Sequence, residues 1–242
     1  MTEPVLRSLL VFGEAFGMPD PSPFCMKARS LLAIANLPYD TAEGDVMKAP
    51  KKKLPVLIEN GVPIPDTTFM RLHLEQKHGI DFDRHLTPEQ VGHAWALEKL
   101  CEDNLYWHIM FDRWMVPHNF DRGPKAFFQS LPAFVRPVLI PIIKRDIRVA
   151  LKWQGTGRHS RAEIHDLARR GIDAIAAALG DKPWICGDEP CGADASVHAT
   201  VTALLCALFE SDLLAHTQSH ENLVAYRARG LAAWYPDFVD QT

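Results

Sequence analysis

The residues best placed to do chemistry lie in the run Asp-Pro-Ser-Pro-Phe-Cys-Met-Lys, between Asp20 and Lys27. Ser22 is a preferred residue type at a helix N-cap, and Pro23 suits the first helical position, where a missing N–H costs nothing. A hydroxyl at such a point lies beside unpaired backbone N–H groups and the positive end of the helix dipole. This corner therefore favours an anion, whether a carboxylate, a phosphate or a thiolate.

Ser22 and Cys25 offer two different chemistries. A serine hydroxyl titrates far above neutral pH, so without a base Ser22 is a poor nucleophile. It can instead donate a hydrogen bond to a bound thiolate and lower the pKa of that thiol, or it can merely cap the helix. Cys25 occupies the fourth position of a Cys-x-x-Cys motif whose first cysteine is missing, so no disulfide can form within the motif. A mixed disulfide with a small thiol and a buried structural role both remain open for Cys25.

The elements that must position this motif alternate within the first eighty residues. Residues 6–12 predict a buried strand, a helix follows from Pro23 to about Asn36, and residues 39–43 predict a second strand. Apolar runs on both sides of Asn60-Gly61 predict a hairpin, and Asp66 begins a second helix that ends near residue 78. The order β-α-β-β-β-α contains no Gly-x-Gly-x-x-Gly, which argues against a dinucleotide-binding unit.

After Gly79 the pattern becomes helical. Capping boxes begin at Thr87 and at Ser160, and the apolar spacing after Thr87 predicts one helix that continues towards Pro117. No strand pattern follows residue 80. We therefore predict an α+β protein with a small α/β unit at residues 1–80 and an all-α unit at residues 87–242.

Composition limits the possible functions. A net charge of −4 argues against a dedicated nucleic-acid binder, although residues 136–170 hold nine Lys or Arg and only three acids. That basic segment is a set of solvated helix faces or a site for an anionic ligand or membrane surface. Five scattered cysteines without a secretory signal indicate a reducing, cytoplasmic setting. The uncharged run 195–209 is too short to span a bilayer.

Taken in order, these motifs resemble the glutathione S-transferase superfamily, and more narrowly the branch that includes the metaxins and the failed-axon-connections proteins. The resemblance implies a thioredoxin-like domain followed by a helical domain. It is carried by five stretches, namely Ser22-Pro23-Phe24-Cys25-x-Lys27, Lys53-Leu54-Pro55, Asp66-Thr67-Thr68-Phe69, Leu105-Tyr106-Trp107 and Gly155-x-Gly157-Arg158-His159-Ser160.

The resemblance also implies a glutathione site. In these folds the Leu-Pro peptide is cis and its backbone pairs with the cysteinyl part of glutathione, while an acid and a hydroxyl at the third helix hold the γ-glutamyl end. A lysine before the Leu-Pro meets the glycyl carboxylate; Lys53 is our choice, with Lys51 and Lys52 as competitors. The expected glutathione-binding residues are Ser22, Phe24, Lys53, Leu54, Pro55, Asp66 and Thr67.

The second substrate is expected between the two units. Tyr106, Trp107, Met110 and Trp114 lie on the first long helix of the second unit and either line this electrophile pocket or belong to the core. A metal site is not expected, because Cys186 and Cys191 lack a second ligand pair and no carboxylate is foreseen beside His216 and His220. Cys191 also stands where the family usually has a Ser or Thr cap, with Asp194 three residues later.

Three functions follow from the sequence. The first is a glutathione transferase that uses glutathione as co-substrate, with Ser22 as the catalytic residue, a small hydrophobic electrophile that the sequence does not identify, and a homodimer as its assembly. The second is a metaxin-like interaction or membrane-surface module without catalysis. The third is a glutathione-dependent thiol reductase in which Cys25 reacts.

Overall fold

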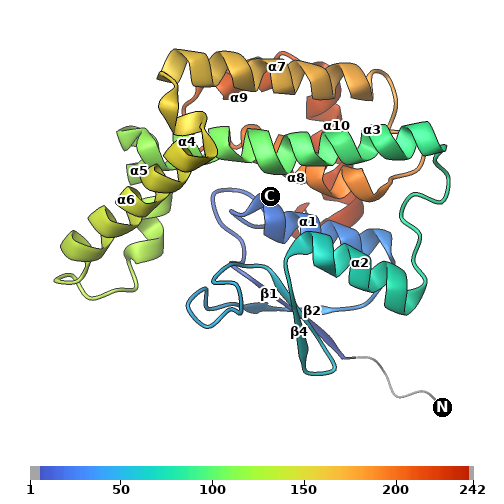
Figure 1. The fold of residues 1–242 in the computed structure, drawn as a ribbon, viewed down its shortest axis with the longest axis horizontal. Helices are drawn as coiled ribbons and strands as arrows, with labels where there is room; N and C mark the ends of the chain where they lie inside the picture. Colours follow the sequence, from blue (N-terminus) through green and yellow to red (C-terminus); the bar gives the residue numbers. More distant parts are fainter. Residues whose placement is uncertain (1–5, 240–242) are drawn as a thin grey trace.

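The computed structural model describes residues 6–239. This part of the chain contains a four-stranded mixed sheet and a set of helices (Figure 1). The strands are β1 (Arg7–Val11), β2 (Asp40–Glu43), β3 (Val56–Glu59) and β4 (Val62–Pro65), in the order β2-β1-β3-β4. β1 pairs parallel with β2 and antiparallel with β3, and β3 pairs antiparallel with β4. Asn60 and Gly61 both have positive φ, 49° and 80°, which confirms the predicted hairpin turn.

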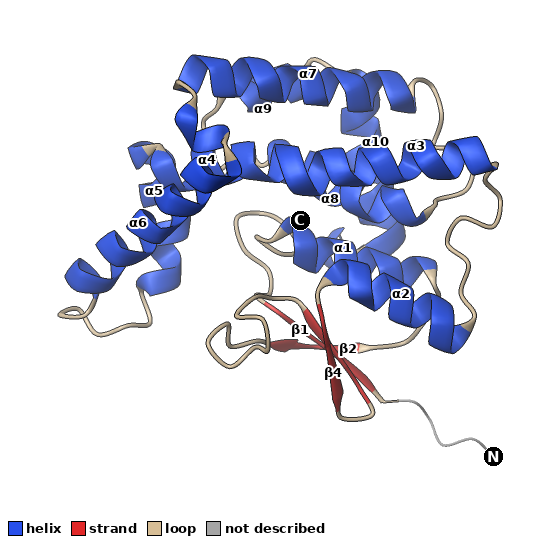
Figure 2. Cartoon of the chain, in the orientation of Figure 1, coloured by secondary structure: helices blue, strands red, loops and turns tan. Residues whose placement is uncertain are grey.

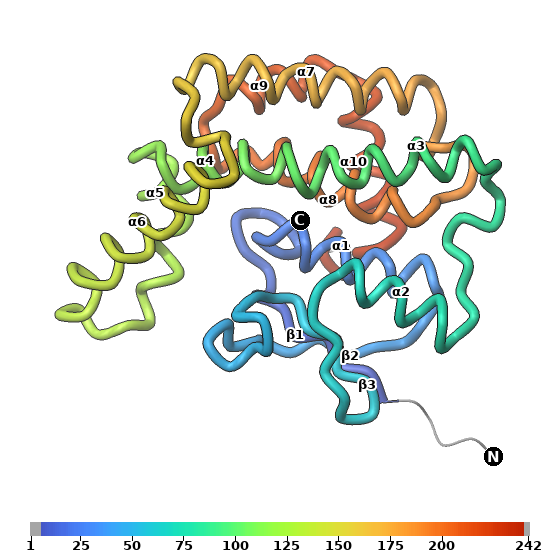
Figure 3. Tube along the Cα trace, in the orientation of Figure 1, coloured from blue at the N-terminus to red at the C-terminus, as the bar shows by residue number. Residues whose placement is uncertain are grey.

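Two helices cover one face of this sheet, α1 (Pro23–Ile34) and α2 (Thr67–His78) (Figures 1 and 2). Leu9 and Leu57 on the strands pack with Leu31 of α1 and Leu74 of α2 in one buried core. Both helices run in the same direction, and their N-terminal ends lie at the same side of the sheet (Figure 3). The fold therefore brings the Ser22 corner and the Asp66 corner to one edge of the molecule.

The remainder of the described chain is helical. Its elements are α3 (Pro88–Lys99), the π-helix η1 (Leu100–Leu105), α4 (Tyr106–Met115), α5 (Pro117–Arg122), the 3₁₀ turn η2 (Pro124–Phe128), α6 (Arg136–Gln154), the 3₁₀ turn η3 (Thr156–Arg158), α7 (Arg161–Leu179), α8 (Gly192–Leu204), α9 (Asp212–Gln218), α10 (Glu221–Trp234) and α11 (Pro236–Val239). Both predicted capping boxes form, at Thr87 and Ser160. α8 is buried along its whole length and packs against α1, so it joins the helical part to the sheet part.

One helix differs from the prediction. The apolar spacing after Thr87 predicts a continuous helix, but six residues, Leu100–Leu105, form a π-helix between α3 and α4. Glu98 before this segment and Glu102 within it both reach Lys27 on α1, and Tyr106 after it packs against Phe24. The π-helix thus lies where this part of the chain contacts α1, and apolar periodicity does not reveal the change in winding.

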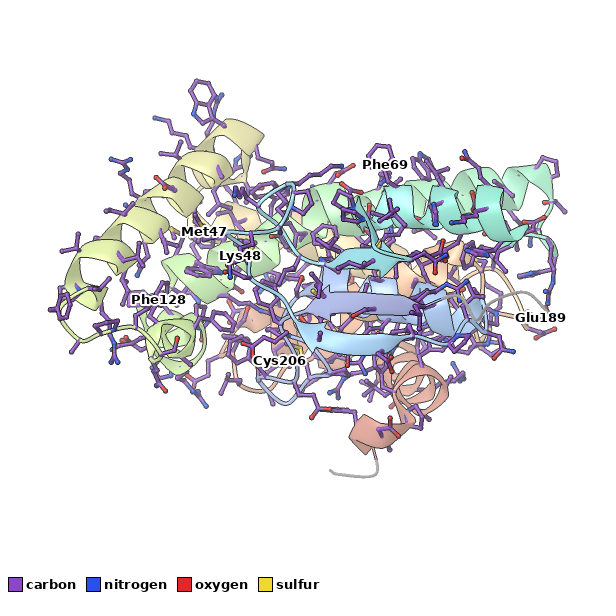
Figure 4. All side chains as sticks on the ribbon, turned by 90° about the horizontal axis from the view of Figure 1, so that it is seen from below. Met47, Lys48, Phe69, Phe128, Glu189 and Cys206 are labelled. Atoms are coloured by element: carbon purple, nitrogen blue, oxygen red, sulfur yellow. The ribbon has the colours of Figure 1, made fainter. Side chains whose placement is uncertain are left out.

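An arm made of α5, η2 and α6 projects from the body beside the N-terminal ends of α1 and α2 (Figures 1 and 3). Leu151 is the one fully buried residue of α6. Figure 4, which looks onto the uncovered face of the sheet, places Met47 and Lys48 of the β2–β3 loop on the side of this arm. Across residues 6–239, none of the helices combines the length and the apolar character needed to cross a membrane.

Candidate functional site

Ser22 is the N-cap of α1, as predicted. Its backbone is extended, with φ −96° and ψ 120°, and its Oγ accepts a hydrogen bond from the Cys25 N–H at 3.4 Å. This distance is at the long end for an N–H···O bond, so the cap itself is weak. Ser22 is half-buried while Pro23 and Cys25 are buried. Ser22 is therefore the partly accessible polar side chain of this turn, beside the positive end of the helix.

Asp20 organises the loop in front of α1, a role that the sequence did not reveal. Its carboxylate accepts hydrogen bonds from the N–H groups of Phe12 and Gly13, each at 3.0 Å, and of Ser22 at 2.8 Å. The side chain is fully buried. Burial outweighs these three hydrogen bonds and raises the pKa of Asp20 to about 6. At neutral pH the group is thus an anion that ties the end of β1 to the start of α1.

Cys25 lies on the inner side of the same turn and is completely buried. Burial, and then the negative charge of Asp20, raise the pKa of the Cys25 thiol well above its ordinary value. A neutral thiol without access to solvent is a poor nucleophile. This arrangement fits the structural role for Cys25 and disfavours its use as the attacking sulfur.

The second corner is formed by Leu54, Pro55 and Asp66. The Leu54–Pro55 peptide is cis, as the resemblance implies. Asp66 caps α2 by accepting a hydrogen bond from the Thr68 N–H at 3.1 Å, and Thr67 beside it is buried. Asp66 has a φ of 80°, a conformation that non-glycine residues rarely adopt and that collects at functional sites.

The three competing lysines take different positions. Lys51 Nζ lies 3.8 Å from the Asp66 carboxylate and 4.4 Å from the centre of the Phe69 ring. Lys52 donates to the Met47 carbonyl oxygen. Lys53 is exposed directly before the cis peptide, and its contact with a glycyl carboxylate stays a prediction. Lys51 is the lysine that the fold brings to the Asp66 corner.

The predicted electrophile-pocket residues separate into two places. Tyr106 packs edge-on against Phe24 at 4.9 Å between ring centres, and Trp107 packs against Tyr106. Trp114 instead packs against Phe120 and Phe128 in the arm, beside a hollow of about 650 Å³ between η2 and α6. Met110, between them on α4, is half-buried. Tyr106 is thus the member of the set next to the Ser22 helix.

Three further aromatic side chains, Phe12, Phe16 and Phe127, lie by this corner and were not predicted as site residues. Phe127 of η2 packs against Phe12 at 6.2 Å and Phe16 at 5.2 Å, on the loop that Asp20 organises. Phe12 and Phe127 remain 39% and 42% exposed, which leaves apolar surface free at the mouth of the corner. Phe127 belongs to residues 117–153, where the family motifs are weakest, so no sequence signal pointed to it.

Arg113 of α4 supports the same turn from behind. This buried guanidinium donates to the carbonyl oxygen of Pro21 at 2.7 Å and to that of Ala203 at 3.2 Å, and it lies 4.7 Å from the centre of the Phe209 ring. Burial lowers the pKa of Arg113 to about 10, so the group stays charged at neutral pH. It therefore adds a positive charge at Pro21, the residue before Ser22.

A buried ion-pair network anchors α1 to the helical part. Lys27 lies 2.8 Å from Glu98 and also pairs with Glu102, whose carboxylate accepts a hydrogen bond from Ser196 at 2.8 Å. Arg71 of α2 reaches the other oxygen of Glu98 at 3.2 Å. Lys27 and Glu98 are 1% and 0% exposed. The position of the Ser22 helix thus depends on charges from α2, α3 and η1.

One expectation about the histidines was wrong. His216 and His220 do have a carboxylate partner, because Asp173 of α7 accepts from the Nε2 atoms of both, at 2.7 Å and 3.0 Å. Asp173 is more than forty residues away along the chain, and only the packing of α7 against α9 brings it there.

Family models match most of this chain. A model described as glutathione S-transferase N-terminal domain matches residues 23–119, and one described as glutathione S-transferase C-terminal domain matches residues 168–230. The isoprene-epoxide–glutathione S-transferase of Rhodococcus sp. (strain AD45) is 28% identical over 232 residues, which cover 91% of this chain and 97% of that protein.

Other relatives carry different names. Failed axon connections of Drosophila melanogaster is 28% identical over 197 residues, 77% of this chain and 47% of that protein. The metaxin-2 homolog of Caenorhabditis elegans is 22% identical over 184 residues, 75% of this chain and 80% of that protein. Both names belong to the branch that the sequence motifs resemble.

Solved structures share the fold. A glutathione S-transferase of Methylobacterium radiotolerans in complex with glutathione sulfonate has a TM-score of 0.61 at 22% identity, covering 97% of this chain and 93% of that one. The β-etherase LigF of Sphingobium sp. has a TM-score of 0.68 at 14% identity, covering 98% and 99%. At these identities the likeness concerns the fold.

Proposed function

Because the chain belongs to the glutathione S-transferase family, we propose that it binds glutathione along the cis Leu54–Pro55 peptide and activates the thiol at the start of α1. The observation that carries this proposal is the difference in exposure at that turn: Ser22 at the helix N-terminus is only half-buried, while Cys25 is completely buried. In this arrangement Ser22 donates a hydrogen bond to the glutathione sulfur, and Asp66 meets the γ-glutamyl end.

The electrostatics of the corner favour a thiolate there. The N-terminus of α1 presents partial positive charge, and the Arg113 guanidinium lies behind Pro21. Both lower the pKa of a sulfur bound at Ser22, because each stabilises the anion more than the neutral thiol. The thiolate then forms a carbon–sulfur bond with an electrophile, and the bond that breaks takes its electron pair to the leaving atom.

The second substrate enters from the arm side. Phe12 and Phe127 leave apolar surface open at the corner, and Tyr106 lines its inner wall. An epoxide is the first class of electrophile to test, because the relative from Rhodococcus is named for an isoprene epoxide. The free thiols of all five cysteines fit a reducing compartment such as the cytoplasm.

A glutathione titration tests the binding step. We expect millimolar glutathione to quench the tryptophan fluorescence of the whole chain saturably, since Trp107 lies on α4 beside Tyr106. S-methylglutathione, which has no ionisable thiol, should compete for the same site. A flat titration with both compounds would remove the transferase proposal.

The arm carries a surface that bears on the assembly of the protein. Five large apolar side chains stand out along α6 and just before it, with exposures from 44% for Ile142 to 82% for Phe134. At 100° per residue they fall within an arc of about 100°; Arg145 and Lys152 lie on the same arc and Arg148 lies beside it. The stripe consists of Phe134, Val138, Ile142, Val149 and Trp153.

This stripe suits either a second copy of the chain or an anionic membrane surface. We propose the homodimer, because a pair of arms would cover the apolar side chains from water. Sedimentation velocity should then give a dimer, and Trp153→Glu should give a monomer. Sedimentation of the protein with anionic vesicles, and not with neutral ones, would instead favour the membrane-surface module.

A further inference from the structure

Asp173, His216 and His220 form a compact cluster far from the Ser22 corner. Asp173 lies on α7, His216 lies in the last turn of α9, and His220 directly precedes α10. These helices lie on the side of the molecule opposite the sheet (Figure 1). Three separate helical elements therefore meet at one carboxylate.

The ligand atoms of this cluster lie close enough together to share one ion. Zn²⁺ ligands sit about 2.0–2.2 Å from the ion, so neighbouring ligand atoms of a tetrahedral site are about 3.3–3.6 Å apart. Asp173 Oδ1 lies 2.7 Å and 3.0 Å from the two Nε2 atoms, which are hydrogen-bond distances, and all three ligand atoms lie within 4.8 Å of one another. An ion would therefore replace these hydrogen bonds with only small side-chain shifts. The two rings lie edge-to-face, 5.2 Å apart, and turn the same nitrogen towards the carboxylate. Two imidazoles and one carboxylate are a ligand set typical of Zn²⁺ and its neighbours.

The exposure and the packing of the three side chains also suit a metal site. The side chains of His216 and His220 are 26% and 27% exposed, so packing restrains both rings, while Asp173 is 51% exposed. An ion held there keeps open positions for water. The ion pairs that the described residues form with Asp173 involve these two histidines and no lysine or arginine, so a cation does not have to displace a positive side chain.

A second cluster in the protein provides the contrast. Glu59, His73 and His78 have the same ligand types at similar spacing. However, Arg7 Nε already lies 2.8 Å from one oxygen of Glu59, and Lys77 Nζ lies 3.0 Å from the other. Glu59 is also buried. A metal ion there would have to displace the Arg7 and Lys77 side chains from a buried carboxylate. The same ligand types therefore do not make an equivalent site.

We propose that Asp173, His216 and His220 bind one borderline divalent transition metal ion, with Zn²⁺ as the reference, and that the ion ties α7 to the turn between α9 and α10. Each histidine binds as neutral imidazole through Nε2 and keeps its proton on Nδ1. Because protons compete with the ion for the ligand atoms, binding weakens as the pH falls. The site is independent of the proposed glutathione chemistry.

Isothermal titration of the tag-free, chelator-treated full chain with ZnCl₂ tests this proposal. We expect one equivalent to bind, and Zn²⁺ to raise the melting temperature in proportion to the logarithm of its concentration. Asp173→Asn and His216→Ala should each weaken binding by more than about tenfold. Co²⁺ should give a visible absorption spectrum that the same substitutions remove.

Two control variants make the result specific. His93→Ala removes an exposed histidine outside both clusters, and His73→Ala removes a ligand of the Glu59 cluster. Both should bind Zn²⁺ like the unaltered chain. The proposal is overturned if His216→Ala binds as tightly as the unaltered chain, or if His73→Ala causes the larger loss. Melting temperatures in chelator show whether each variant is folded, so a folding defect is not read as lost binding.

Discussion

Replacing Ser22 by alanine should raise the pKa of bound glutathione. A hydrogen bond from a hydroxyl to a charged group contributes about 1.5–3 kcal/mol. Since one pH unit corresponds to about 1.4 kcal/mol, the bound thiol in Ser22→Ala should titrate about one to two pH units higher. The cap at 3.4 Å is long, so the loss of folding stability should stay below about 1 kcal/mol.

The pH profile of conjugation separates this effect from a structural one. At a pH below the thiol pKa, kcat/KM of Ser22→Ala should fall by about 10- to 100-fold, because the fraction of thiolate falls by that factor. Above the raised pKa the deficit should shrink, since the thiol then ionises without help. Ultraviolet absorbance of the thiolate gives the bound pKa directly, and S-methylglutathione supplies the baseline.

Two variants control the experiment. Ser22→Thr keeps a hydroxyl at the same position and should keep most of the activity. Cys25→Ala removes a fully buried thiol and should leave the bound pKa unchanged. If Ser22→Ala titrates like the unaltered protein while Cys25→Ala abolishes turnover, the reacting sulfur is that of Cys25 and our assignment is refuted.

Three further predictions concern the rest of the molecule. Lys27→Met should lower the free energy of unfolding in urea by about 3 kcal/mol, because it leaves the buried carboxylates of Glu98 and Glu102 without this partner. The control Lys48→Met removes an exposed ion pair and should change the free energy of unfolding little. Equal effects of the two substitutions would contradict the role of the network. Burial lowers the pKa of His198 to about 4, below its unfolded value near 6.5, so its contribution is complete above pH 6.5 and is lost as the pH falls towards 4. Between about pH 6.5 and pH 4 the free energy of unfolding should therefore fall by about 3 kcal/mol less in His198→Gln than in the unaltered chain. Parallel curves of unfolding free energy against pH would disprove this. Trp153→Glu should shift the sedimentation coefficient from dimer to monomer, and an unchanged coefficient would exclude the α6 stripe as the contact.

Local chemistry made much of the fold predictable. The cap at Ser22, the Asn60-Gly61 turn and the capping boxes at Thr87 and Ser160 each specify a conformation through residues within three positions of each other. All four form as predicted. The division into units at residues 1–80 and 87–242 remains a prediction. The position of the last described strand, which ends at Pro65, is compatible with it.

The parts that escaped prediction depend on residues far apart in the sequence. Lys27 meets Glu98 from more than seventy positions away, and Arg113 meets Pro21 from more than ninety. A buried lysine and a buried arginine look like ordinary surface residues until their partners are placed. The carboxylate at His216 was missed for the same reason, because it comes from Asp173 on another helix.

The contrast between Ser22 and Cys25 shows why the sequence left two candidates and the fold favours one. Both side chains lie within one helical turn, so both are close to the same helix dipole. The difference lies in what surrounds each. Cys25 is close to the buried carboxylate of Asp20, which opposes a second negative charge, whereas Ser22 is only half-buried and follows Pro21, whose carbonyl oxygen accepts from Arg113. A negative sulfur is therefore unfavourable on the inner side of the turn, which supports our proposal that the thiolate belongs to the ligand.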